Sequence, residues 1–178
     1  MVVLVLALLL LATPTPTASG SGGGSKAAKR LAQAHEMYEA ARFAEAAMRF
    51  AKVLPPAPSK KLQASLEKAG LGPLQLTPYR REFARALVVT RDYSAAAEQL
   101  GQMRGAMGFL PSPALAGRFE SDVLREEAQV YQCTGKLKKA AKALRTSIKL
   151  LKDAGTGSSA PRPADFFERY QRLSTLEK

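Results

Sequence analysis

The stretch "ARFAEAAMRFAKVL" at residues 41–54 decides the fold class of this chain. Its apolar side chains lie three, four, seven and eleven residues after Phe43. This spacing places them on one side of an α-helix, which completes a turn about every 3.6 residues. The stretch therefore predicts a helix that packs through one face, and by itself it indicates no chemistry.

Two later segments repeat this pattern and extend it to a pair of helices. Residues 32–54, 81–103 and 125–148 each carry a small residue, a large residue three positions on, a turn, an apolar anchor and then an alanine. In that order the positions hold Ala34, Met37, Phe43 and Ala46, then Ala84, Leu87, Tyr93 and Ala96, then Ala128, Tyr131, Leu137 and Ala140. Small side chains let helix axes approach, and the anchors are expected to fill the wedge at each turn. The chain therefore predicts three copies of one helix–turn–helix unit.

These positions resemble the tetratricopeptide repeat, with the closest matches at residues 43–46 and 135–140. The resemblance implies an all-α fold in which antiparallel helix–turn–helix units form a short right-handed solenoid over residues 27–178. The anchors are 50 residues apart from Phe43 to Tyr93 and 44 apart from Tyr93 to Leu137. Because the family repeat is about 34 residues long, extra chain is expected between the units.

The extra chain carries local start and stop signals. A short helix is expected from Ser59, as its N-cap, to Ala69, where Gly70 stops it. Thr77 and Pro78 predict the cap and first turn of the next helix. Residues 101–117 contain several Gly and Pro residues, which predicts an irregular connection.

The last segment predicts a helix that begins near Pro163 and closes the end of the solenoid. Its apolar positions share one helical face and comprise Phe166, Tyr170, Leu173 and either Leu176 or Phe167. A helical repeat needs such an element to cover its last apolar face. This segment is therefore predicted to be a C-terminal capping helix.

The N-terminus has the character of a targeting segment. An apolar run covers residues 2–12, too short for a membrane span of about 20 residues. Ala18, Ser19 and Gly20 follow it in a small-x-small arrangement. These features predict a signal peptide at residues 1–19, a flexible Gly/Ser linker at 20–26, and an exported protein that is periplasmic or secreted, with an uncleaved anchor as the alternative.

No set of residues predicts catalysis, a cofactor or a metal centre. Cys133 is the only cysteine and His35 the only histidine, so the chain lacks a disulfide and offers no cysteine zinc site. Cys133 is predicted to pack as a small hydrophobic residue, and His35 to lie at the surface or in a groove. Glu126 and Glu127 have no nucleophile in their unit, and solvated surface positions are predicted for them.

The resemblance to the tetratricopeptide family implies a binding surface. In that family a partner peptide usually lies in a concave groove lined by the first helix of each unit. Carried over by position, the groove residues are His35, Tyr38, Arg81, Arg85, Arg125, Gln129 and Gln132. Their basic and amide groups suit a carboxylate or an acidic peptide, and the alternative is an ordinary exposed helix face. The expected function is a non-catalytic adaptor or scaffold that binds another protein or peptide.

Basic charge gathers in residues 136–152, which contain seven basic residues and no acid. The basic face of the expected helix comprises Lys138, Lys139, Lys142, Arg145 and Lys149. The formal net charge of +12 would attract acidic partners. The alternative function is therefore a basic helical module that docks on an anionic membrane or a polyanionic cell-wall surface. The repeat pattern favours a helix whose apolar stripe faces inward and whose lysines are solvated. Nucleic acid is not an expected partner, because the aromatic residues occupy packing positions.

Overall fold

The computed structural model describes residues 26–154 and 161–177, which form helices and no strand. The elements are α1 (Lys26–Glu39), α2 (Phe43–Ala51), α3 (Lys60–Lys68), α4 (Pro73–Val89), α5 (Tyr93–Gly105), the 3₁₀ helix η1 (Ala106–Phe109), α6 (Pro113–Cys133), α7 (Leu137–Asp153) and α8 (Pro163–Leu176). The all-α prediction is confirmed. The predicted signal peptide at 1–19 and nearly all of the linker at 20–26 lie outside the described residues.

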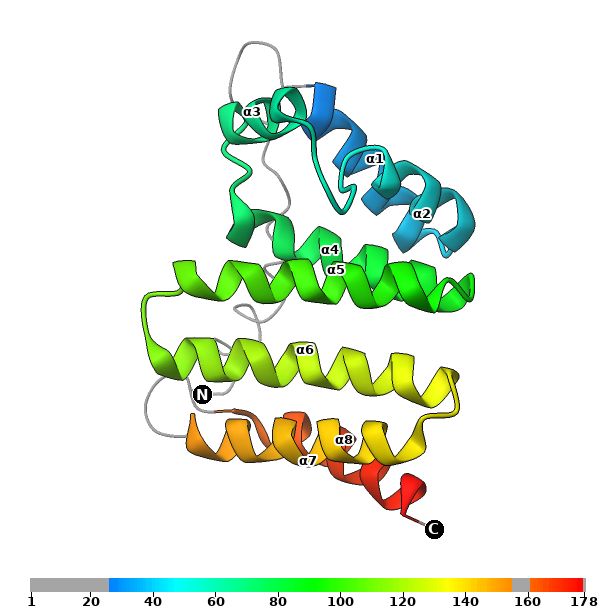
Figure 1. Cartoon of the computed structure of the whole chain (residues 1–178), viewed down its shortest axis with the longest axis vertical. Helices are drawn as coiled ribbons and strands as arrows, with labels where there is room; N and C mark the ends of the chain where they lie inside the picture. The colour runs from blue at the N-terminus through cyan, green and yellow to red at the C-terminus, as the bar shows by residue number, and fades with distance from the viewer. Residues whose placement is uncertain (1–25, 155–160, 178) are drawn as a thin grey trace, which may run out of the picture.

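The helices form three antiparallel hairpins, α1–α2, α4–α5 and α6–α7, which follow one another along the long axis of the molecule (Figure 1). In each hairpin the residue two positions before the anchor has a left-handed backbone: φ is 57° at Ala41, 66° at Arg91 and 72° at Gly135. The next backbone N–H donates to the carbonyl five residues earlier, over 2.9, 2.9 and 2.8 Å. The three hairpins therefore share one turn, a Schellman motif.

The predicted alanine contact points are confirmed. Each of the six alanines lies in the core with at most 2% of its surface exposed; they are Ala34, Ala46, Ala84, Ala96, Ala128 and Ala140. Among the anchors, Phe43 and Tyr93 pack against the main core. Leu137 is 50% exposed, so its predicted wedge role is wrong. Tyr38, five residues before Phe43, packs edge-on against that anchor. Gln132, five residues before Leu137, instead accepts a hydrogen bond from Arg172.

The first inserted segment follows its local signals only in part. The Ser59 side chain accepts a hydrogen bond from the N–H of Leu62 at 3.3 Å, and Gly70 ends α3 with φ of 71°, as predicted. The prediction for Thr77 and Pro78 is wrong, because α4 already begins at Pro73. Thr77 donates to the Pro73 carbonyl at 3.2 Å and does not cap the helix. A first-turn proline fits a helix start, because the first turn has no use for its missing N–H.

The prediction that residues 101–117 form an irregular connection is also wrong. Helix α5 continues to Gly105, η1 follows it, and α6 starts at Pro113 with Ser112 as its N-cap. Met103 and Ala106 lie inside the core, at 0% and 2% exposure. Burial of these side chains outweighs the weak helix propensity of the neighbouring glycines.

The C-terminal helix α8 packs against α7 and caps the last hairpin (Figure 1). Leu173 and Leu176 contact the second core cluster, as predicted. Phe166 is half-buried, whereas Tyr170 is 45% exposed and Phe167, the alternative to Leu176, is 70% exposed. The buried residue of α8 is Arg169, at 0% exposure. A polar contact therefore sits where the sequence predicted an apolar one.

The shared turn makes a direct prediction about backbone strain. A left-handed backbone costs a residue with a Cβ atom roughly 1–2 kcal/mol, and glycine avoids this cost. We expect Arg91→Gly to raise the free energy of unfolding by about 1 kcal/mol, measured by urea denaturation. Gly135→Ala is the matched reverse change, and it should lower the free energy by a similar amount. An added Cβ there meets no atom within 4 Å, so only backbone strain is measured. Equal stability of all three proteins would contradict the shared turn.

Candidate functional site

The first helices of the hairpins, α1, α4 and α6, stand in a row, and α8 takes the next place in it. All seven predicted groove residues lie on the same side of this row of helices. Each of them contacts a residue of a neighbouring helix or a neighbour on its own helix. We call this surface the first-helix face and define it by His35, Tyr38, Arg81, Glu82, Arg85, Asp122, Arg125, Glu126, Gln129, Gln132, Glu168 and Arg172.

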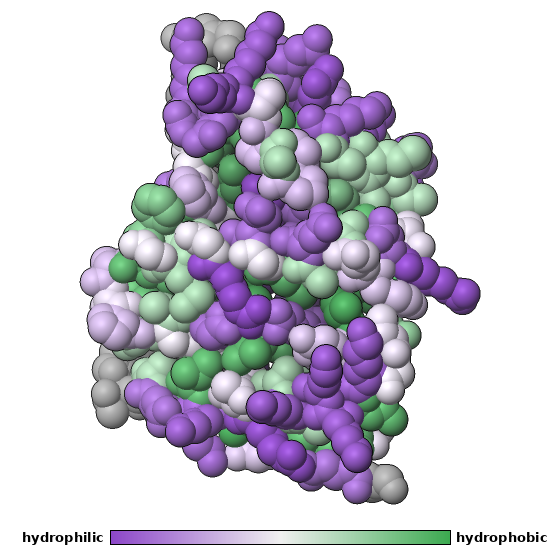
Figure 2. All heavy atoms as spheres, viewed as in Figure 1, coloured by the Kyte–Doolittle hydropathy of each residue, from purple (hydrophilic) through white to green (hydrophobic). Residues whose placement is uncertain are grey.

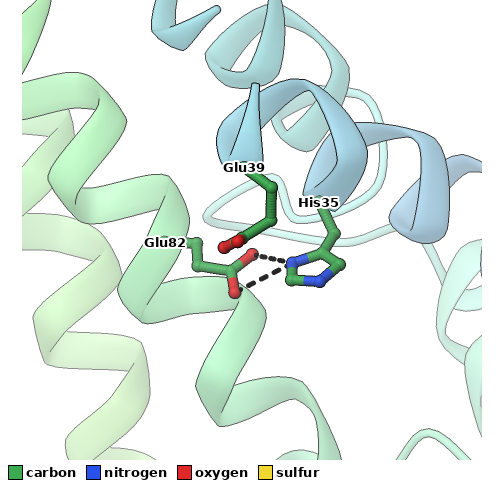
Figure 3. A group of neighbouring side chains, drawn as sticks. All are labelled: His35, Glu39 and Glu82. Atoms are coloured by element: carbon green, nitrogen blue, oxygen red, sulfur yellow. Dashed lines mark hydrogen bonds and ion pairs between the residues drawn. The ribbon is translucent and has the colours of Figure 1, made fainter. Parts of the chain in front are cut away.

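Between α1 and α4, the face is built around His35. Its Nδ1 atom donates to both carboxylate oxygens of Glu82, each at 3.0 Å. Glu39, one helical turn after His35, points to the same place (Figure 3). Burial raises the pKa of Glu82 above its ordinary value, and this outweighs the opposing effect of the hydrogen bond from His35. His35, Glu39 and Glu82 form a compact group of potential metal ligands within the described residues.

Between α4 and α6, two ion pairs repeat the same register. Arg81 lies 3.4 Å from Asp122, and Arg85 binds Glu126 through two hydrogen bonds of 3.1 and 2.5 Å. In each pair the partners are 41 residues apart in the sequence. The arginines are four residues apart on α4 and the acids four apart on α6, so each pair joins matching helix faces.

Glu126 is the most buried acid of this face, with 10% of its side chain exposed. Burial alone would raise its pKa, but the hydrogen bonds and positive charges of Arg85 and Arg125 hold the pKa below its ordinary value. Arg125 binds Glu126 at 3.0 Å, and so one carboxylate serves two guanidinium groups. The prediction that Glu126 and Glu127 are solvated is wrong, because Glu126 is buried, Glu127 is half-buried and both acids are ion-paired.

Side-chain contacts also join α6 to α8, the last helix of the row. Arg125 binds Glu168 at 3.1 Å. Arg172 donates to the amide oxygens of Gln129 and Gln132, at 2.8 and 2.6 Å. Helix α8 therefore adds a fourth set of side chains to the face.

A pocket of about 310 Å³ opens where these helices meet. Its floor is apolar and comprises Ala84, Val88, Val89, Leu100 and Val130. Its rim is polar and comprises Arg85, Arg125, Glu126, Gln129, Glu168 and Arg172. Three guanidinium groups and two carboxylates give this rim one net positive charge. Such a pocket accommodates one apolar side chain beside an acidic group.

The acids of the first-helix face were not predicted from the sequence. Glu82, Asp122 and Glu126 neutralise most of the predicted basic character, so the charge of the face is mixed. Hydrophilic side chains also alternate with apolar ones over the surface seen in Figure 2. A search for acids that lie about 41 residues after each predicted arginine would have found Asp122 and Glu126.

The basic face of α7 lies in solvent, as predicted. The side chains of Lys138, Lys139, Lys142, Arg145 and Lys149 are all exposed. Arg145 pairs with Glu177, and no described acid lies within ion-pair distance of the four lysines. The predicted apolar stripe of the helix faces inward except at its first position, Leu137, which is 50% exposed; its buried residues are Ala140, Ala141, Leu144, Ile148 and Leu151.

Cys133 is exposed, so the prediction that it packs in the core is wrong. It is the last residue of α6, where the chain turns toward α7. Its sulfur accepts a hydrogen bond from Gln129 at 3.6 Å.

Comparisons of this chain with protein-family models, curated proteins and solved structures found no match. Within the described parts of the chain, no helix is long and apolar enough to cross a membrane. What the protein does must therefore be inferred from its own residues.

The low pKa of Glu126 predicts a pH dependence of folding. An acid whose pKa is lower in the folded chain stabilises it above its unfolded pKa, about 4.3, and this contribution disappears as the pH falls through the folded value. We expect Glu126→Gln to lower the free energy of unfolding at pH 7 by about 1–3 kcal/mol. The variant should also lose less stability than the wild type between pH 7 and pH 3.

Urea denaturation across this pH range measures both effects. Glu98→Gln is the matched control, because Glu98 is an exposed acid of α5. The prediction fails if the control and Glu126→Gln have the same pH profile.

Proposed function

We propose that this protein is a non-catalytic adaptor that binds a segment of a partner protein on the first-helix face. The observation that carries the proposal is the pocket between α4, α6 and α8, with its apolar floor and charged rim. Val89 lines it and remains 56% exposed, so a partner can reach the apolar surface. Fully desolvated apolar pockets with polar rims are where binding energy concentrates in protein interfaces.

The chemistry of the rim suggests which segments bind. Arg172 is held mainly by the neutral amides of Gln129 and Gln132, and Glu168 lies 3.7 Å away. Its positive charge is thus only partly compensated within the protein. In a partner segment, an apolar residue would fill the pocket and a neighbouring acidic residue would neutralise the charge of Arg172. This fits a partner of acidic character.

The proposal includes a tetratricopeptide-like architecture and export from the cytoplasm. The shared hairpin turn and the six buried alanines support the repeat assignment. Export rests on the sequence of residues 1–19 alone. The expected outcome is that N-terminal sequencing of protein from the exported fraction finds a chain that begins near residue 20.

Selection of peptides from a random display library tests the binding proposal. Selected peptides should share an apolar residue flanked by acidic residues, and Val89→Asp should weaken their binding at least about tenfold, or 1.4 kcal/mol. Met48→Asp is the matched control, because Met48 is 61% exposed on α2, away from the pocket. The proposal fails if no such peptides are selected, or if both variants bind them as the wild type does.

The exposed lysines of α7 favour a second candidate function, docking on an anionic membrane or cell-wall polymer. Lys138, Lys139 and Lys142 have no acidic partner among the described residues, so their charge is available. Binding to vesicles that contain anionic lipid, or to a polyanion, should weaken as salt rises, because salt screens charges and reduces the entropy gained when counterions are released. It should also weaken when the three lysines are replaced by glutamine. Binding that resists both changes excludes this function.

A further inference from the structure

His35, Glu39 and Glu82 lie together at the junction of the first and second hairpins (Figure 3). We propose that these three side chains form a binding site for one divalent transition-metal ion, with Zn²⁺ as the probe. The site is separate from the pocket, and the proposal does not depend on the proposed adaptor function.

The positions of the ligand atoms support a single ion. His35 and Glu39 are four residues apart on α1, so their side chains leave the helix on the same side. Glu82 reaches them from α4, and the ligand atoms of all three lie within 4.8 Å of one another. Neighbouring ligand atoms around a tetrahedral zinc ion are roughly 3.3 Å apart, as bond lengths near 2.1 Å require. Modest side-chain rotations therefore suffice to reach the geometry of a zinc site.

The His35–Glu82 contact already resembles half of a metal site. Nδ1 of His35 faces both carboxylate oxygens at 3.0 Å, with a proton between the two groups. An ion that replaces this proton would need little movement of either side chain. Tyr79 packs edge-on against the imidazole ring at a centroid distance of 6.3 Å, which restricts the orientation of the ring.

The charges around the site favour a cation. Two carboxylates share one imidazole, and the oxygen atoms of Glu39 and Glu82 lie close enough to repel each other. The positive charge of Arg85 also acts on Glu82, but this guanidinium is already bound to Glu126. A divalent ion would relieve the repulsion between Glu39 and Glu82. It would also reach the site, because 36% of the His35 side chain and 18% of the Glu82 side chain are exposed.

The ligand set determines the class of ion. A ligand set of one imidazole nitrogen and carboxylate oxygens suits Zn²⁺ and similar divalent ions. Soft metal ions prefer thiolate ligands, which this group lacks. Three protein ligands leave a fourth position for water or for a donor from another molecule. Because the ligands come from α1 and α4, the ion would link the first two hairpins.

The single histidine makes the test specific. His35 is the only histidine of the chain, so its imidazole C–H protons give the only histidine signals in the proton NMR spectrum. Titration of the metal-free full chain with ZnCl₂ should shift these signals and saturate at one equivalent. Unchanged signals in an excess of ZnCl₂ would overturn the proposal without any variant.

Substitutions identify the remaining ligands. Isothermal titration calorimetry should show that His35→Gln, Glu39→Gln and Glu82→Gln each weaken Zn²⁺ binding at least about tenfold. Glu36→Gln is the matched control, because it removes an exposed carboxylate from the same helix but leaves the group intact. Zinc binding that survives His35→Gln, or that falls equally in Glu36→Gln and Glu39→Gln, would also overturn the proposal. Far-ultraviolet circular dichroism checks that each variant remains folded.

Discussion

Each hairpin closes through one backbone hydrogen bond, from the N–H after a left-handed residue to the carbonyl five residues earlier. This bond fixes where the second helix starts relative to the first, and so the alanines of the two helices meet. With the same register in each unit, equivalent positions on successive first helices face one another. The ion pairs Arg81–Asp122 and Arg85–Glu126 depend on this repetition. The candidate site is therefore a consequence of the turn.

The end of the row is held by polar contacts around a buried guanidinium. Arg169 of α8 donates to the Ser147 hydroxyl at 2.7 Å, to the Asp165 carbonyl at 2.6 Å and to Asp122 at 2.8 Å. Ser147 in turn exchanges hydrogen bonds with Ser121 of α6. Burying a guanidinium without partners would cost several kcal/mol, and these contacts offset that cost. Because Asp122 also pairs with Arg81, the cap and the first-helix face share a residue.

Several features that depend on nearby residues could be predicted from the sequence, whereas polar contacts between distant residues could not. The cap at Ser59 is local and forms as predicted, and Asp92 caps α5 through an equally local contact with the N–H of Ala95. Residues 101–105 are helical although their glycines predicted an irregular connection, because Met103 is buried in the core. The predicted groove arginines follow from helix position alone, but their acidic partners lie a whole repeat away. The mixed charge of the face needed the structure, because only the packing of α4 on α6 brings those residues together.

Helix α4 contributes both to the group of His35, Glu39 and Glu82 and to the pocket. Glu82 faces α1 and Arg85 faces α6, and the two residues are only three positions apart. One turn of an α-helix moves as a unit, so a shift of Glu82 relative to α1 also shifts Arg85 relative to Glu126. An ion at His35, Glu39 and Glu82 would thus act on the helix that lines the pocket. Such coupling must be reciprocal, because binding free energies form a closed cycle. If the ion strengthens partner binding, the partner strengthens ion binding by the same factor.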